Sequence, residues 1–270
     1  MVENHTRFLQ SQHCPFLSGP LFDDVGLLGD SSAAEDILNG TYSNNHIPTV
    51  TQQYITHLQR PAHVNTDETL RTFDINDHIR GWNKAKERTA AKPHGLSFAH
   101  YKAAVKHKEI AAFDYIMREV PFRAGFVPQE WKNITDLQIY KNNRERDVES
   151  MRTITLFSSD FNINNKLLGQ RIMKQAEANN ILAPEQFGSR KNHRSNMVAL
   201  NHRITFDLCR QRRQALAIVS VDAKSCYDRI IHNVACLSLR RIGIPIEPLL
   251  CMFKTLQTAH HYVMTAFEIS

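Results

Sequence analysis

The chain has 270 residues, 42% of them apolar and 22% charged, which excludes a collagen-like or low-complexity protein. It has no apolar run approaching 18 residues and no secretory signal, and its five scattered cysteines form no CxxC pair, so we expect an intracellular protein that neither is secreted nor contacts a membrane. The net charge of +6 favours polyanionic partners.

The first part of the chain divides into two segments. Residues 1–65 mix Asn, Ser, Thr, His and Gly without clear periodicity, and predict a poorly ordered leader. Residues 66–125 predict a mainly helical segment, with one helix in 68–90 and a second in 100–120. Pro121 is expected to end the second helix, because proline cannot donate the next helical hydrogen bond.

The middle of the chain predicts two strands and two helices. β-Branched content favours strands in 130–141 and 153–159, joined by a charged hairpin-like stretch. Apolar residues four apart predict a helix over 164–180, and Ser195 is a plausible N-cap for another. The apolar face of that later helix carries Met197, Leu200, Ile204 and Leu208.

The last part begins with a short, continuous apolar run. Residues 216–221 are typical of a central strand buried on both sides, and Asp222 ends it. A helix is expected over about 230–242, where Gly243 and Pro245 give it a stop signal.

A charge at the end of a buried strand has two readings. A carboxylate there supplies the hard oxygen ligand that Mg²⁺ prefers, and loops at strand ends are where catalytic groups collect. Alternatively, Asp222 caps the next turn through an Asx-turn completed by residues 223–225. The residue types alone leave both readings open.

The surrounding sequence resembles a known family. The string SVDAKSCYDRI, residues 220–230, is similar to the first palm motif of reverse transcriptases, in particular those of eukaryotic retrotransposons. Further similar stretches follow in the order of that family, at 93–102, 131–141, 151–172, 184–200 and 239–245. The resemblance implies an α+β fold with the fingers and partial palm of a right-hand polymerase. Residues 126–215 would be fingers-like and residues 216–270 an incomplete palm.

The resemblance assigns roles around the first palm motif. Asp222 matches the first metal-binding aspartate, and the backbone carbonyl of Ala223 would help to hold a second ion, either Mg²⁺ or Mn²⁺. Tyr227 matches an aromatic steric gate that excludes a ribose 2′-OH, although a core aromatic is the plain alternative. Asp228 fits a structural role better than a metal ligand.

Two cations match the family's contacts to the triphosphate. Arg152 corresponds to the fingers arginine that contacts the incoming deoxynucleotide triphosphate, and Lys141 to the lysine on the partner strand. A guanidinium suits this task because it pairs bidentately with phosphate oxygens and stays charged. The alternative for both residues is an exposed charge on a hairpin.

A basic stretch matches the family's contact with the template strand. Between residues 186 and 213 the only acid is Asp207, against seven cations, and a solvated helix face is the plain alternative. Asn192 stands where the family commonly has glycine. The residues implied to bind nucleic acid are Gln186, Gly188, Arg190, Lys191 and Arg194.

The family's remaining carboxylates have no counterpart here. Polymerases transfer a nucleotide to a primer 3′-OH with two metal ions, and the family takes further ligands from an Asp-Asp hairpin after the first palm motif. Beyond Asp228 the only acids are Glu247 and Glu268. The Asp23–Asp24 pair upstream fits a surface turn better than a permuted catalytic pair. We therefore expect a truncated RNA-directed DNA polymerase domain, inactive alone, with RNA template and DNA primer as partners.

Two other functions compete with that reading. A non-catalytic nucleic-acid-binding remnant would reuse the basic stretch and bind in a salt-sensitive way. A metal-dependent hydrolase is suggested by 14 histidines. However, neither His260–His261 nor the pair His193 and His202 has a one-face ligand spacing, and HExxH is absent.

Overall fold

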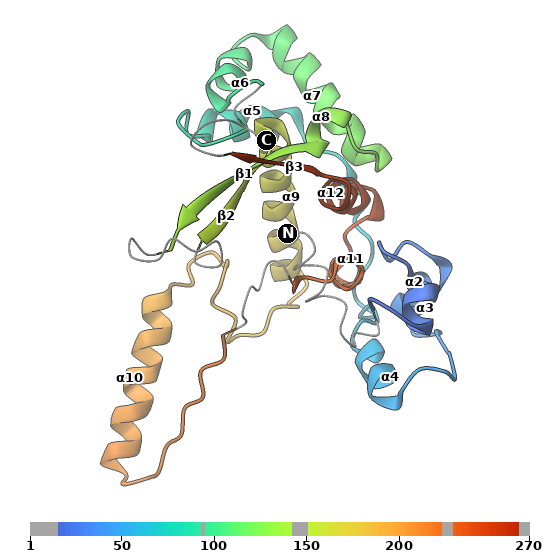
Figure 1. Ribbon diagram of the computed structural model, residues 1–270. Coiled ribbons are helices and arrows are strands. Elements are labelled where there is room, and N and C mark those ends of the chain that lie inside the picture. Colours follow the sequence, from blue (N-terminus) through green and yellow to red (C-terminus); the bar gives the residue numbers. More distant parts are fainter. Residues whose placement is uncertain (1–15, 93–94, 142–150, 223–228, 265–270) are drawn as a thin grey trace.

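Helices dominate the structure, a computed structural model, and they surround one small sheet in the described part of the chain (Figure 1). The prediction of an α+β fold is therefore confirmed at this level. None of the described helices has both the length and the apolarity to cross a bilayer. The structure describes residues 16–92, 95–141, 151–222 and 229–264.

The sheet joins segments that are far apart in the sequence. It holds β1 (Asn133–Tyr140), β2 (Met151–Leu156) and β3 (His260–Met264) in the order β2-β1-β3. β1 pairs antiparallel with β2 and parallel with β3. The strands expected in 130–141 and 153–159 are thus confirmed, the second shifted toward its N-terminal side.

Helix α9 (Ser159–Ala178) links three of the hydrophobic clusters. Its Ile163 packs with Trp82, and Leu168 packs in the cluster of Trp131. Near its C-terminal end, Ala176 joins a third cluster. These side chains fall on the buried face of a 20-residue helix, so α9 holds the surrounding elements together.

The helical segment before the sheet contains four short elements and one long helix. Their order is η1 (Glu68–Arg71), α5 (Ile75–Lys84), α6 (Phe98–Ala104), α7 (Lys108–Ala124) and α8 (Gln129–Lys132). The expectation that a helix ends at Pro121 is wrong, because α7 continues through it and ends at Gly125, whose φ is +67°. Phe122 is completely buried with Trp131, and this burial offsets the helical hydrogen bond that Pro121 cannot make.

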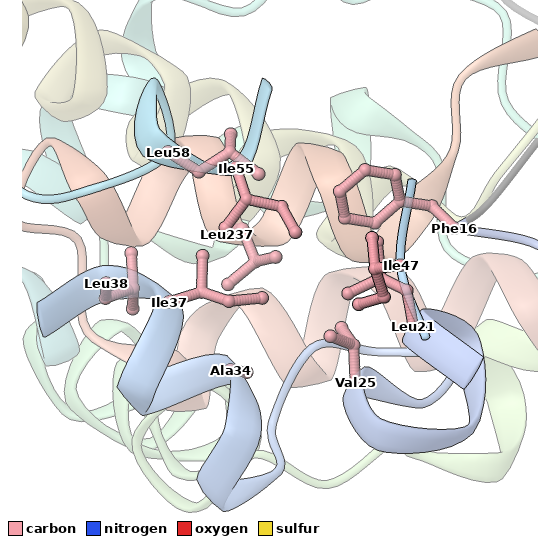
Figure 2. Packing of buried hydrophobic residues seen from close by; sticks show 10 residues of the cluster. All are labelled: Phe16, Leu21, Val25, Ala34, Ile37, Leu38, Ile47, Ile55, Leu58 and Leu237. Atoms are coloured by element: carbon pink, nitrogen blue, oxygen red, sulfur yellow. The ribbon is translucent and has the colours of Figure 1, made fainter. Parts of the chain in front are cut away.

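The expectation of a poorly ordered leader differs from the structure over residues 16–65. Helices α2 (Pro20–Val25), α3 (Ser32–Asn39) and α4 (Thr49–Thr56) lie there. Figure 2 shows their apolar side chains converging on Leu237, which comes from near the other end of the chain. Residues 1–15 lie outside the described part. The N-terminal helices therefore share a core with the C-terminal part of the chain.

Helix α11 (His232–Arg241) contributes Leu237 to that core, whereas α12 (Ile246–Gln257) packs in two other clusters through Leu249 and Cys251. The predicted stop after α11 is confirmed, since Gly243 has a φ of +91°. A Cβ atom at this position would lie 2.4 Å from the backbone oxygen of Asn65. Only glycine fits this close approach between α11 and the N-terminal segment.

Helix α10 (Ser195–Gln211) and the segment after it bury almost nothing. None of its 17 residues is buried, and Figure 1 shows the helix extending away from the rest of the molecule. The expected buried strand at 216–221 is absent: residues 214–222 have no regular structure and are exposed. A strand buried on both sides needs neighbouring strands, and none of the described strands pairs with this run.

Candidate functional site

Asp222 lies at the end of the exposed segment that follows α10. Val219 and Val221 before it are 83% and 89% exposed, so the apolar run meets solvent here. The Asp222 carboxylate is also exposed. Ala223 and Tyr227, the neighbours that the family resemblance singles out, lie outside the described residues, as does Asp228.

The β1–β2 hairpin carries the two cations expected to contact a triphosphate. Arg152 stands opposite Ile139 in the antiparallel register and is exposed. Lys141 follows two residues after Ile139 and is also exposed. Lys141 lies just after the last residue of β1 and Arg152 is the second residue of β2, so both cations stand at the same end of the hairpin.

The loop between α9 and α10 is folded around Arg190. Its guanidinium pairs with both carboxylate oxygens of Glu177, at 2.9 and 3.0 Å. It also donates to the backbone oxygens of Ala183, at 3.0 Å, and Gln186, at 3.3 Å. The hydrogen bonds from Arg190 lower the pKa of Glu177. The side chain of Arg190 thus holds the loop in shape, a task that the sequence reading did not foresee.

The same loop contains two residues with left-handed backbone. Ser189 has a φ of +61° and Asn192 a φ of +65°. Asparagine is one of the few side chains that tolerates this region, so Asn192 makes the turn for which the family commonly uses glycine. The rings of Phe187 and His193 meet edge to face, with centroids 5.4 Å apart, and close the loop.

Two cations remain exposed at the end of this loop. Lys191 and Arg194 face solvent, and Arg194 is the residue immediately before α10. Gln186 and Gly188 lie within the loop, where the Gln186 side-chain amide donates to the Gly188 oxygen at 3.4 Å. The five residues expected along the template therefore lie together in and beside this loop. The guanidinium of one of them, Arg190, is paired with Glu177.

The sequence patterns did not predict a buried carboxylate in β1. Asp136 accepts hydrogen bonds from Thr155 at 2.9 Å and from His261 at 2.8 Å, so one side chain connects the three strands. Burial raises the pKa of Asp136, but the bonds from His261 and Thr155 outweigh burial and lower the pKa. The contact rests on a parallel pairing of β1 with β3 across more than 100 residues, which no local pattern reveals.

Other acidic and histidine residues do not form a metal centre in the described part of the chain. Within that part, no three His, Cys, Asp or Glu side chains are placed to hold an ion. Asp24 lies on α2 and accepts hydrogen bonds from Tyr42 at 2.7 Å and Asn44 at 2.9 Å. This engagement favours a structural role for Asp24, although Asp23 and Asp24 lie in a helix and not in the surface turn expected from the sequence.

Comparisons with known proteins place the site in a wider context. Residues 139–266 match the model of a family described as reverse transcriptase (RNA-dependent DNA polymerase). A curated relative from Drosophila melanogaster, named "Probable RNA-directed DNA polymerase from transposon BS", is 30% identical over 114 residues. Those residues are 41% of this chain and 12% of the relative, so the chain spans only a small part of that protein's length. The matched range includes every residue assigned above to nucleotide, metal or template.

Proposed function

We propose, from the match of residues 139–266 to the reverse transcriptase family and from the similarity to a transposon-encoded relative, that the chain supplies the fingers and first palm segment of an RNA-directed DNA polymerase. The substrates would be an RNA template, a DNA primer and deoxynucleotide triphosphates. The observation that carries the proposal is the pair of exposed cations, Lys141 and Arg152, at one end of the β1–β2 hairpin. Two cations at the same end of a hairpin suit the adjacent phosphates of a triphosphate.

Each remaining assignment has its own physical reason. Lys191 and Arg194 are exposed beside a loop that Arg190 holds in shape, so they are free to contact phosphates of a template strand. Tyr227 follows Asp222 by five residues and would exclude a ribose 2′-OH from the nucleotide site. These contacts position the template and the incoming nucleotide, which is most of what phosphoryl-transfer enzymes contribute.

Asp222 would provide the first metal ligand. Mg²⁺ commonly binds proteins through one or two carboxylates and completes its shell with water and substrate phosphates. The exposed Asp222 carboxylate fits one such position, and the ion would neutralise charge on the triphosphate. Two-metal transfer needs further carboxylates near Asp222, and the only acids after Asp228 are Glu247 and Glu268. We therefore propose that the 270 residues alone bind nucleic acid and nucleotide without extending a primer.

The test is a binding and extension assay on the purified chain with a labelled RNA–DNA primer-template. We expect salt-sensitive binding that the double variant Lys191→Ala, Arg194→Ala weakens about tenfold, because two phosphate contacts are lost. The matched control, Lys106→Ala with Lys108→Ala, removes two exposed charges elsewhere and should bind normally. Absence of binding would refute the proposal.

A second measurement separates this function from that of a non-catalytic nucleic-acid-binding remnant, an alternative that the exposed segment 214–222 favours. In the proposed function, the complementary deoxynucleotide with Mg²⁺ slows release of the primer-template severalfold, and Arg152→Ala removes that effect. A remnant shows no response to nucleotide. Primer extension in Mg²⁺ or Mn²⁺ that is abolished by Asp222→Ala would overturn the claim that the chain is inactive alone.

A further inference from the structure

A wide groove lies outside the residues assigned so far, between α9 on one side and α5 with the segment before it on the other. Its volume is about 880 Å³. The two helices approach closely where Gly81 faces Leu167: a Cβ atom at Gly81 would lie 3.3 Å from a methyl carbon of Leu167. Five cations and three carboxylates line the groove, which leaves two positive charges in excess.

The floor of the groove is fixed by Arg171. Its guanidinium donates to the backbone oxygens of Thr69, at 3.1 Å, and Thr72, and pairs with Asp77 at 3.1 Å. It also lies over the ring of Phe73, 5.2 Å from the centroid. Arg171 therefore has its partners within the protein and serves to shape the groove.

The three carboxylates of the groove are likewise engaged. Asp67 accepts from the amide and hydroxyl of Thr69, at 3.0 and 2.6 Å, and Asp74 accepts from the amide of Asn76 at 2.7 Å. Asp77 pairs with Arg171 and with Arg80. These contacts turn the negative charges toward local donors, so they oppose an incoming anion less than free carboxylates would.

Three lysines on the walls have no ion pair among the described residues. They are Lys84 on α5 and Lys166 and Lys174 on α9, and all three are exposed. Lys166 and Lys174 are eight residues apart, so they stand about 12 Å apart along one face of the helix, with Gln170 between them. In a duplex that distance spans about three phosphates of one strand.

The aromatic rings of the groove are already occupied. Arg171 covers Phe73, and Tyr115 donates its hydroxyl to the Phe73 oxygen at 2.7 Å and meets the ring of His78. Neither ring offers a free face on which a base could stack. The groove thus presents charge and an amide without a platform for bases, which suits a phosphate backbone better than a nucleotide.

We propose that this α5–α9 groove binds the sugar-phosphate backbone of a nucleic-acid strand, without reading its sequence, through Lys84, Lys166 and Lys174. The inference rests on the proposed function in taking nucleic acid as the polyanion. It adds a contact that lies partly before the family-matched range, since α5 ends at Lys84. The strand would then be held at two places, the groove and the loop of Lys191 and Arg194.

The experiment measures how binding of a mixed-sequence RNA–DNA primer-template depends on salt, for the whole chain. We expect the triple variant Lys84→Gln, Lys166→Gln, Lys174→Gln to reduce the slope of log affinity against log salt by about 2 to 3, because three phosphate contacts are lost. The control triple Lys86→Gln, Lys106→Gln, Lys108→Gln removes the same charge from exposed positions outside the groove and should keep the slope of the unmodified chain.

Chemical footprinting gives an independent readout. Bound nucleic acid should protect Lys84, Lys166 and Lys174 from acylation and leave Lys106 reactive. If the unmodified chain binds nucleic acid without protection of the three lysines, and the groove variant matches it in slope, the groove inference is overturned while the proposed function stands. If the unmodified chain does not bind at all, the proposed function fails and the groove inference fails with it.

Discussion

At the scale of single residues, the structure is held by charged side chains buried at the junction of several helices. Arg118 pairs with Asp114 and with Asp160, and Asp114 also accepts from His78 at 3.0 Å. The indole of Trp131 donates to Asp160 at 2.6 Å. This network connects α5, α7, α8 and α9, and it holds the start of α9 shortly after β2.

Asp114→Asn should reveal how much this network contributes. Burial raises the pKa of Asp114, but the bond from His78 and the charge of Arg118 outweigh burial and lower the pKa below 3.8. A lowered folded-state pKa gives stability that is present above 3.8 and is lost as the pH falls through the folded value. We expect the variant to lose roughly 3 kcal/mol of unfolding free energy at pH 7 and to show a smaller loss below pH 3.8 than the unmodified chain.

Urea unfolding at pH 7, 5 and 2.5 would measure both effects. The control Asp23→Asn changes an exposed carboxylate and should leave the pH dependence as it is. Equal pH dependence in the Asp114→Asn variant and the unmodified chain would contradict the role given to the network.

At the scale of elements, the segment that enters α12 depends on a glycine that no other residue can replace. Gly243→Ala would combine an unfavourable φ of +91° with a contact of 2.4 Å to the Asn65 oxygen. We expect it to cost at least about 2 kcal/mol. Gly169→Ala, on α9 with open space around it, should instead stabilise the chain by about 0.5–1 kcal/mol. Thermal unfolding of both variants measures these two effects. A Gly243→Ala variant as stable as the unmodified chain would contradict the close approach of Gly243 to the Asn65 oxygen.

Local sequence patterns predicted the elements that depend on local preferences. The spacing of apolar residues located α9 and α10, β-branched content located β1 and β2, and Gly243 marked the end of α11. The patterns failed where a partner distant in sequence decides the outcome. α2 to α4 have six to eight residues each, too few for a stable helix alone, and they form because α11 completes their core.

The same reasoning explains which parts of the site the sequence could predict. The strand pattern predicted the hairpin but not its bounds, since Lys141 lies just after β1 and Arg152 lies within β2. Arg190 was expected to face a nucleic acid, but its partner Glu177 lies 13 residues earlier on another element, which no spacing rule reveals. The run at 216–221 has the composition of a strand, yet composition supplies no neighbouring strand to pair with.

At the scale of the whole molecule, the N-terminal segment and the family-matched region form one structure. The amide of Asn233 on α11 donates to the backbone oxygens of Phe16 and Gly26, each at 2.8 Å. Arg240, one of the buried charged residues, donates to the Gly29 oxygen at 2.7 Å and pairs with Glu35. Residues that precede the matched range by more than 100 positions thus hold a helix within that range.

Leu237→Ala tests this connection. Leu237 is completely buried among the side chains of α2, α3 and α4, so its truncation should cost roughly 3 kcal/mol. Limited proteolysis should then cut first within residues 16–65, although the substitution is far away in sequence. Leu200→Ala, on α10 and 57% exposed, is the matched control and should change neither stability nor cleavage. If Leu237→Ala leaves the pattern of cleavage unchanged, the N-terminal helices fold independently of α11.

Because α10 has no buried side chain, its backbone hydrogen bonds should open often. A helix of 17 residues with no buried side chain persists only through its own propensity, and a peptide of that length is marginal in water. Its amide hydrogens should therefore exchange with deuterium far sooner than those of α9, which is fastened along most of its length. A nucleic-acid strand lying against its arginines would slow that exchange, so α10 would report occupancy of the neighbouring loop without any label attached.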